Sequence, residues 1–145
     1  MPVYDAPLAE IDPVTLYKIL RLRSDVFVVE QECVYLDLDG RDLEPSARQV
    51  WAEEDDEVLA GLRLLVDADG SARIGRVVTA PSARGAGHAA ALMQRALELS
   101  VGVPVVLEAQ SHLAGWYARF GFEVSGPDYV EDGIPHTPMR RESRE

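Results

Sequence analysis

Residues 81–100, "PSARGAGHAAALMQRALELS", place Gly85 and Gly87 at the start of a segment with helical apolar spacing. A glycine within a helix costs about 1 kcal/mol relative to alanine, so two close together need a reason. Backbone N–H groups at a helix start form an anion site with the helix dipole, and glycine lets a phosphate approach them closely. The stretch therefore predicts a phosphate-binding loop followed by a helix. The alternative is a helix that begins at Gly85 or Gly87 without any ligand.

A meander of three strands is predicted before this loop, at residues 49–52, 58–66 and 72–80. The turns between them are "EEDDE" and "DADGS", and Asp-Gly between β-prone runs is a strong hairpin signal. A helix is predicted to precede the meander, with Asp12 as its N-cap and Pro13 at its first position. Arg23 falls on the apolar face of that helix, and a buried guanidinium needs an acidic partner.

The C-terminal third predicts a crossover. "VPVVLEA" is expected to be a central strand, "SHLAGWYARFGF" a short helix, and "FEVSG" and "IPHTPMRR" terminal strands. A strand–helix–strand crossover among antiparallel strands gives a mixed sheet. The sequence therefore predicts an α/β (mixed α+β) fold with helices on both faces of the sheet.

The chain has 145 residues, 47% of them apolar, which suits one domain spanning residues 1–145. Its net charge of −11 disfavours nucleic-acid binding and weakly favours cationic partners, although solubility alone also accounts for it. The first residues lack a signal-peptide pattern, and no apolar run approaches the ~20 residues of a membrane span. We expect a cytoplasmic protein, with no nucleic acid or membrane among its partners, and either a monomer or a homodimer.

No metal site is predicted. Cys33 is the single cysteine, and its acidic neighbours favour a buried or half-buried residue over a nucleophile. "DLDGRD" and "DADGSA" resemble calcium loops, but both have glycine at the fourth position instead of the sixth. Arg48 and Val78 stand where the bidentate glutamate should be.

Two nucleotide ligands fit the glycine loop. "GAGHAA" matches the dinucleotide pattern G-x-G-x-x-G/A, with Glu108 as a possible ribose ligand. Against this reading, "PSAR" separates the preceding strand from the first glycine, a hairpin meander replaces parallel βα units, and little chain follows Glu108. The pyrophosphate of coenzyme A (CoA) is the other candidate.

"RGAGHA" at residues 84–89 resembles the Arg/Gln-x-x-Gly-x-Gly/Ala signature of the GNAT superfamily of acyl-CoA-dependent N-acetyltransferases. The blocks "RLRSDVFVVEQECVYLDLDGRD", "GRVVTAPSARGAG", "AQSHLAGWYARFGF" and "YVEDGIPHTPM" extend this resemblance over nearly the whole chain, toward the ElaA-type branch. The resemblance implies a GNAT fold, in which a bulged strand splays from the next parallel strand and opens a slot for pantetheine.

The resemblance also implies which residues bind acetyl-CoA. Backbone groups of Val77, Val78 and Thr79 would pair with pantetheine, and the Val78 N–H would polarise the thioester carbonyl. Gln110 would lie near the pantetheine, or it would only satisfy backbone groups at a helix start. The loop N–H groups would hold the pyrophosphate, from Arg84, Gly85, Ala86, Gly87, His88 and Ala89.

The resemblance implies direct attack of a neutral amine on the thioester. Tyr117 in "WYARFGF" would protonate the departing thiolate, or it would be a core aromatic like Trp116 and Phe120. The proton acceptor stays open: Glu108 and His112 are the first candidates, with further ones or a water relay also possible. Those further candidates are Glu30, Glu131 and His136, although His136 would otherwise bind the acceptor or, as we favour, hold the acidic loop in place.

The predicted function is an N-acetyltransferase that uses acetyl-CoA as co-substrate and an amine as acceptor, either a small molecule or a protein lysine or N-terminus. Acidic stretches make a cationic acceptor plausible. The alternative is a non-catalytic CoA-binding or interaction module that kept the cofactor slot. One position departs from the ElaA-type pattern: this chain has Gln49 where proteins of that branch commonly have a histidine.

Overall fold

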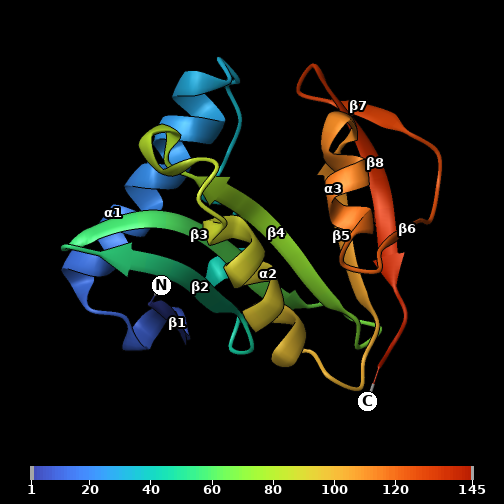
Figure 1. The fold of residues 1–145 in the computed structure, drawn as a ribbon, viewed down its shortest axis with the longest axis horizontal. Coiled ribbons are helices and arrows are strands. Elements are labelled where there is room, and N and C mark those ends of the chain that lie inside the picture. Colours follow the sequence, from blue (N-terminus) through green and yellow to red (C-terminus); the bar gives the residue numbers. More distant parts are fainter. Residues whose placement is uncertain (1, 145) are drawn as a thin grey trace.

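The computed structural model describes residues 2–144, and Figure 1 shows their arrangement. The strands are β1 (Val3–Ala6), β2 (Arg48–Glu54), β3 (Glu57–Val66), β4 (Ala72–Thr79), β5 (Val105–Gln110), β6 (Glu123–Val124), β7 (Tyr129–Glu131) and β8 (Ile134–Arg141). The α-helices are α1 (Pro13–Arg23), α2 (His88–Glu98) and α3 (Ala114–Ala118). Shorter helical segments are η1 (Leu8–Glu10), η2 (Ser24–Glu30), η3 (Arg41–Leu43), η4 (Pro81–Ala83) and η5 (Ser111–Leu113).

The strands form one mixed sheet in the order β1-β2-β3-β4-β5-β8-β6, with β7 paired to β8. Among the strands of residues 2–144, β4 and β5 are the only parallel neighbours, and the other pairs are antiparallel. Helix α2 connects the two parallel strands, as a crossover requires. The predicted three-strand meander, crossover and mixed sheet are confirmed. The short strands β1 and β7 were not predicted, since each has too few residues for a recognisable alternation.

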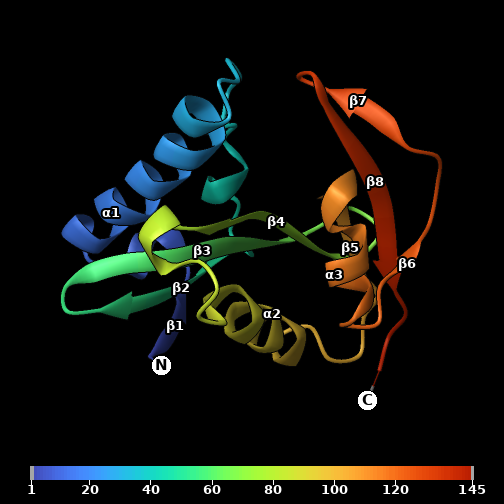
Figure 2. The same cartoon turned by 45° about the horizontal axis from the view of Figure 1, so that its top comes forward.

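Helices cover both faces of the sheet, and Figure 2 shows α1 and α2 on opposite sides of it. Ile19, Leu22 and Val26 lie in the core cluster under α1, together with Trp51 and Val78. The other face packs against α2 and α3 through a larger cluster that includes Leu92, Met93, Leu107, Tyr117 and Phe122. These two layers confirm the predicted fold class.

Helix α1 begins as predicted: the Asp12 carboxylate accepts from the backbone N–H groups of Val14 (3.1 Å) and Thr15 (3.2 Å). It continues into η2, a π-helical segment. The β-branched residues Val26, Val28 and Val29 lie in this wider turn, in keeping with their poor fit to a regular helix. Segment η2 ends at Glu30 and brings it next to the loop before α2, where Glu30 pairs with Arg84.

Candidate active site

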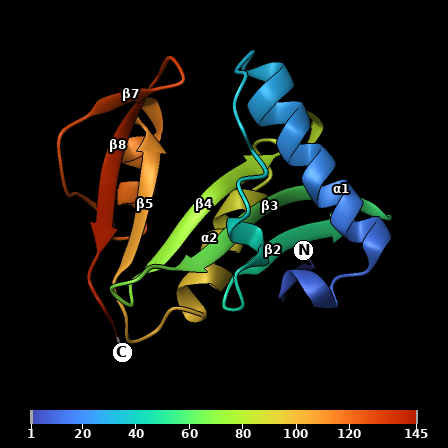
Figure 3. The same cartoon turned by 180° about the vertical axis from the view of Figure 1, so that it is seen from behind.

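A slot opens in the sheet because β4 and β5 separate soon after they pair. Their parallel register covers only Ala72–Ile74 against Val105–Leu107. Beyond it, β4 bulges: Arg76 and Val77 both oppose Leu62 of β3, and Arg76 has φ of 53°. Figures 1 and 3 show the two strands diverging from this end. The splayed strands and the bulge are the features that the resemblance implied for a pantetheine slot.

The ladder between β3 and β4 determines which backbone groups face the slot. The Ala80 N–H donates to the Leu59 carbonyl at 2.8 Å. Antiparallel ladders alternate, so Val78 directs its backbone toward β3, whereas Val77 and Thr79 direct theirs toward the slot. This corrects the expectation for the Val78 N–H, whose residue instead buries its side chain under α1.

The glycine loop precedes α2 as predicted. Gly85 has φ of 87°, and Gly87, the N-cap of α2, has φ of 83°. Glycine adopts this left-handed conformation at little cost. A Cβ added at either position would meet nothing within 4 Å, so the loop surface is open to a ligand. Within the described residues no side chain caps α2, which leaves its first N–H groups available to an anion.

Arg84 of this loop is held by two elements. Its Nη1 and Nη2 both lie 2.9 Å from the Glu30 carboxylate, and its Nε donates to the Thr79 carbonyl at 3.2 Å. The hydrogen bonds from Arg84 lower the pKa of Glu30. The pair joins η2 to the glycine loop at the end of β4.

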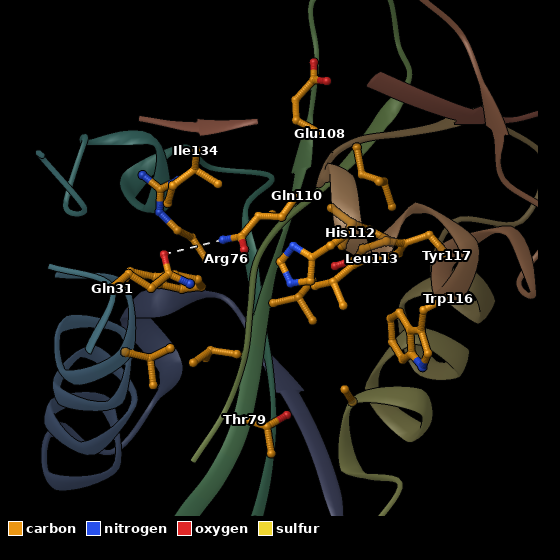
Figure 4. Close-up of a pocket in the computed structure, with 18 of the residues that line it drawn as sticks. Gln31, Arg76, Thr79, Glu108, Gln110, His112, Leu113, Trp116, Tyr117 and Ile134 are labelled. Carbon is orange, nitrogen blue, oxygen red and sulfur yellow. Dashed lines mark hydrogen bonds between the residues drawn. The ribbon is translucent and has the colours of Figure 1, made fainter. Parts of the chain in front are cut away.

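A pocket of about 820 Å³ connects the glycine loop, the slot and the far end of β5. It is lined by most of the predicted site residues, which are Val77, Val78, Thr79, Arg84, Gly85, Gly87, His88, Ala89, Glu108, Gln110, His112 and Tyr117. Ala86 is exposed and does not line it. In the close-up of Figure 4, Gln110 and His112 lie between Gln31 on one side and Tyr117 on the other.

Tyr117 lies at the α3 side of the pocket and is 7% exposed. The Trp116 and Phe122 rings contact it edge-on, with centroids 4.9 Å and 6.5 Å away. Burial raises the pKa of its phenol to about 12. Tyr117 is therefore both a core aromatic and a pocket residue, so the two readings of the sequence are compatible.

The candidate proton acceptors differ in their surroundings. The Glu108 carboxylate forms an ion pair with Arg73 at 3.4 Å and lies away from the Gln110–His112–Tyr117 group in Figure 4. His112 is exposed on η5 and makes no hydrogen bond to another described residue. The carboxylate of Glu30 is paired with Arg84.

The remaining candidates, Glu131 and His136, lie on the β7–β8 hairpin and line the same pocket. Glu131 is exposed, whereas His136 is half-buried and its Nδ1 lies 2.8 Å from the Ile134 carbonyl. The structure brings all five candidates to one pocket, and it places the Nδ1 of His136 against a backbone carbonyl.

Gln110 crosses from β5 toward η2. Its Nε2 donates to the Gln31 side chain at 3.4 Å, a contact drawn as a dashed line in Figure 4.

Cys33 also lines this end of the pocket; it is buried as predicted, and its thiol lies 3.3 Å from the Asp132 carbonyl. Burial, with a contribution from the charge of Asp132, raises the pKa of this thiol, which opposes a nucleophilic role.

Sequence reasoning missed Arg76, which sits at the bulge and lines the pocket. Its Nε forms an ion pair with Asp37 at 2.8 Å, its Nη2 donates to the Asp37 carbonyl at 3.1 Å, and its guanidinium lies 5.4 Å from the Tyr35 ring centroid. Asp37 also pairs with Arg23 at 3.1 Å, so the acidic partner predicted for Arg23 is found. The buried arginine on the apolar helix face was the one signal for this network.

No group of three or more His, Cys, Asp or Glu side chains within residues 2–144 is placed to hold a metal ion. In the same part of the chain, no helix is both long and apolar enough to cross a membrane.

Residues 28–143 match the model of the acetyltransferase (GNAT) domain. The chain is 44% identical to a UPF0039 protein of Mycobacterium tuberculosis over 91% of this chain and 87% of that protein. It is 41% identical to the protein ElaA of Escherichia coli over 92% of each chain.

Solved structures agree with these matches. An acyl-CoA N-acyltransferase from Pseudomonas aeruginosa superposes with a TM-score of 0.91 at 43% identity, over 97% of this chain and 98% of that one. The fold is also shared with an aminoglycoside 6'-N-acetyltransferase that was solved with coenzyme A, at a TM-score of 0.76, 13% identity and coverage of 98% and 97%.

Proposed function

The chain belongs to the GNAT acetyltransferase family, in the group of proteins similar to ElaA, and we propose that it transfers an acetyl group from acetyl-CoA to an amine by direct attack on the thioester. One observation carries the proposal: a single pocket joins an open glycine loop, the splayed edge of β4 and the buried phenol of Tyr117. If the glycines only began a helix and bound no ligand, the loop would not need to share a pocket with the edge of β4 and with Tyr117.

The residues fit acetyl-CoA at both ends of the slot. The absence of atoms within 4 Å of an added Cβ at Gly85 and Gly87 leaves room for a pyrophosphate at the backbone N–H groups of residues 84–89, Ala86 and His88 among them. Backbone groups of Val77 and Thr79 face the slot, where pantetheine amides would pair with them. Acetyl-CoA supplies the activated carbonyl carbon that the amine attacks.

Tyr117 is the proposed donor to the departing sulfur. A phenol with a pKa of about 12 stays protonated at neutral pH and can donate a hydrogen bond at the slot. Full proton transfer to a thiolate, whose acid has a pKa near ~8.5, would be uphill. Tyr117 therefore stabilises the developing negative charge mainly by its hydrogen bond.

The proposed acceptor is a cationic amine. The far end of the pocket carries Glu131 and Asp132, together with Glu108, whose charge is partly compensated by Arg73 at 3.4 Å, and the chain has a net charge of −11. Arg76 lines the same end, but Asp37 and Asp39 lie 2.8 Å and 3.5 Å from its guanidinium and compensate its charge. Carboxylates at the mouth would raise the local concentration of polyamines, aminoglycoside-like amines or lysine side chains.

The test is an acetyl-CoA turnover assay with a panel of such amines, read by release of free thiol. Tyr117→Phe should lower kcat by about 10²-fold or more while the CoA dissociation constant stays within twofold. Tyr17→Phe is the matched control, because Tyr17 is 69% exposed on α1 and does not line the pocket. Unchanged turnover of Tyr117→Phe would remove Tyr117 from the mechanism.

Melting temperatures with CoA and with NAD, together with the same amine panel, distinguish the proposed enzyme from a CoA-binding module and from a dinucleotide-binding protein. If CoA raises the melting temperature but every amine is inert, the chain is a CoA-binding module and not an enzyme. If NAD stabilises the protein and CoA does not, the glycine loop binds a dinucleotide.

A further inference from the structure

His136 has a tautomer fixed by its own strand. Its Nδ1 lies 2.8 Å from the Ile134 carbonyl oxygen. A carbonyl oxygen can only accept a hydrogen bond, so Nδ1 must carry the hydrogen. In the neutral ring the lone pair is then on Nε2, to which the structure gives no hydrogen bond from another described residue. His136 thus presents an unoccupied basic nitrogen.

The ring is also held in position by a residue of the neighbouring strand β7. Tyr129 of β7 stacks on it, with centroids 5.6 Å apart and an interplanar angle of 19°. The register pairs His136 with Tyr129 on one side and with Gln110 of β5 on the other. Residues directly opposite each other in antiparallel strands share a face of the sheet, so these three side chains form a row.

This row lies across the sheet from Tyr117. Side chains alternate along β5, and Leu107 and Ala109 pack in the same cluster as Tyr117. Gln110, and His136 opposite it, therefore belong to the other face of the sheet. Both His136 and Tyr117 nevertheless line the one pocket that passes through the slot. Tyr117 as proton donor and His136 as proton acceptor therefore approach the slot from opposite faces of the sheet. This separation keeps them from forming a hydrogen bond with each other.

The other candidates are less suited to receive a proton. Arg73 pairs with Glu108 and Arg84 pairs with Glu30, so each carboxylate is already bound to a guanidinium group. His112 and Glu131 are exposed, and no hydrogen bond to another described residue fixes either side chain.

We infer that Nε2 of His136 accepts the proton that the attacking amine loses, an inference that rests on the proposed acetyltransferase function. The amine N–C bond forms, the C–S bond breaks, and its electron pair goes to sulfur, which accepts a hydrogen bond from Tyr117. The amine proton goes to Nε2, while Nδ1–H continues to donate to the Ile134 carbonyl. Solvent then takes the proton from the imidazolium.

The first experiment measures turnover with an amine that the wild-type protein acetylates. His136→Gln should lower kcat by 10²-fold or more, with the CoA dissociation constant within twofold of wild type. His136→Ala should show the same loss and regain at least tenfold in added imidazole. His112→Gln, the matched histidine variant, should lose at least tenfold less than His136→Gln. The reverse order, or absence of imidazole rescue, would overturn the inference.

The second experiment needs no loss-of-function variant. Long-range ¹H–¹⁵N correlation spectra of the wild-type protein report the tautomer of its three histidines, with His136→Gln assigning the signal. A neutral His136 protonated at Nδ1 is expected, and protonation at Nε2 would refute the inference. A wild-type protein inactive with every amine would instead refute the proposed function, and the inference would fall with it.

Discussion

Arg23 of α1 and Asp42 of η3 form a buried ion pair, with Nη1 2.8 Å from Oδ1. The Asp42 carboxylate also accepts from Gln49 of β2 at 2.8 Å and from Arg63 of β3 at 3.2 Å. The arginine is 2% exposed and the aspartate 6%. Asp37 extends this network from Arg23 to Arg76 at the bulge of β4. A polar network beneath the sheet therefore supports the strand that borders the slot.

Asp42→Asn should destabilise the protein by about 3 kcal/mol, because it leaves the buried guanidinium groups of Arg23 and Arg63 with one carboxylate each, Asp37 and Asp39, instead of two. Urea unfolding at pH 7 measures this free energy. Asp25→Asn is the control, since Asp25 pairs with Arg21 at 3.8 Å on the exposed side of α1. That change should cost at most about 1 kcal/mol. Equal effects of the two variants would contradict a stabilising role for the buried network.

Acid should unfold the protein through the same carboxylates. Hydrogen bonds from Arg63 hold the pKa of Asp39 well below its ordinary value of 3.8. Burial alone would raise the pKa of Asp42, but Arg23, Gln49 and Arg63 outweigh it and lower the pKa. The unfolded chain binds these protons at a higher pH than the folded one, so stability is present above pH 4 and falls as the pH drops through the lowered values.

Urea midpoints measured between pH 7 and pH 2 test this expectation. The midpoint should fall steadily below pH 4 in the wild type. Asp39→Asn should start from a lower midpoint and show a shallower pH dependence, because it removes one of the linked protons. An unchanged slope would show that Asp39 does not contribute to acid unfolding.

Gly87→Ala should weaken CoA binding and lower stability by about 1–2 kcal/mol, because φ of 83° is strained for any residue with a Cβ. Gly115→Ala is the control: Gly115 lies in α3 with ordinary φ and nothing within 4 Å of an added Cβ. That substitution should stabilise by about 0.4–1 kcal/mol. Melting curves with and without CoA measure both effects. A Gly87→Ala protein with wild-type affinity for CoA would argue against pyrophosphate binding at the loop.

Glu30→Gln should tighten CoA binding severalfold. The carboxylate of Glu30 occupies both Nη atoms of Arg84 and would repel a pyrophosphate at the neighbouring loop. Removing its charge frees Arg84 for the anion. Isothermal titration at low and high salt measures the gain, which should shrink as salt screens the charges. Weaker binding of the variant would mean that Glu30 mainly positions Arg84.

Much of the fold could be predicted from the sequence because its signals are local. The Asp-Gly turn in "DADGS" identified the β3–β4 hairpin, and Asp12 with Pro13 identified the start of α1. Gly85 and Gly87 identified a loop that does take the left-handed conformation. Strand β7 was missed although the Asp132-Gly133 turn joins it to β8, because its three residues are all exposed and show no apolar alternation.

The sequence by itself determined the order of the elements and the open loop before α2, since turns, caps and glycine conformations depend on a few neighbouring residues. Only the tertiary structure decided that the backbone groups of Thr79 rather than those of Val78 face the slot, that Arg84 is paired with Glu30, and that His136 stands across the sheet from Tyr117. Each of these depends on strand register, on a bulge or on a contact between residues far apart in the chain. A register shift of one residue moves every side chain of a strand to the opposite face of the sheet, and no local sequence pattern indicates such a shift.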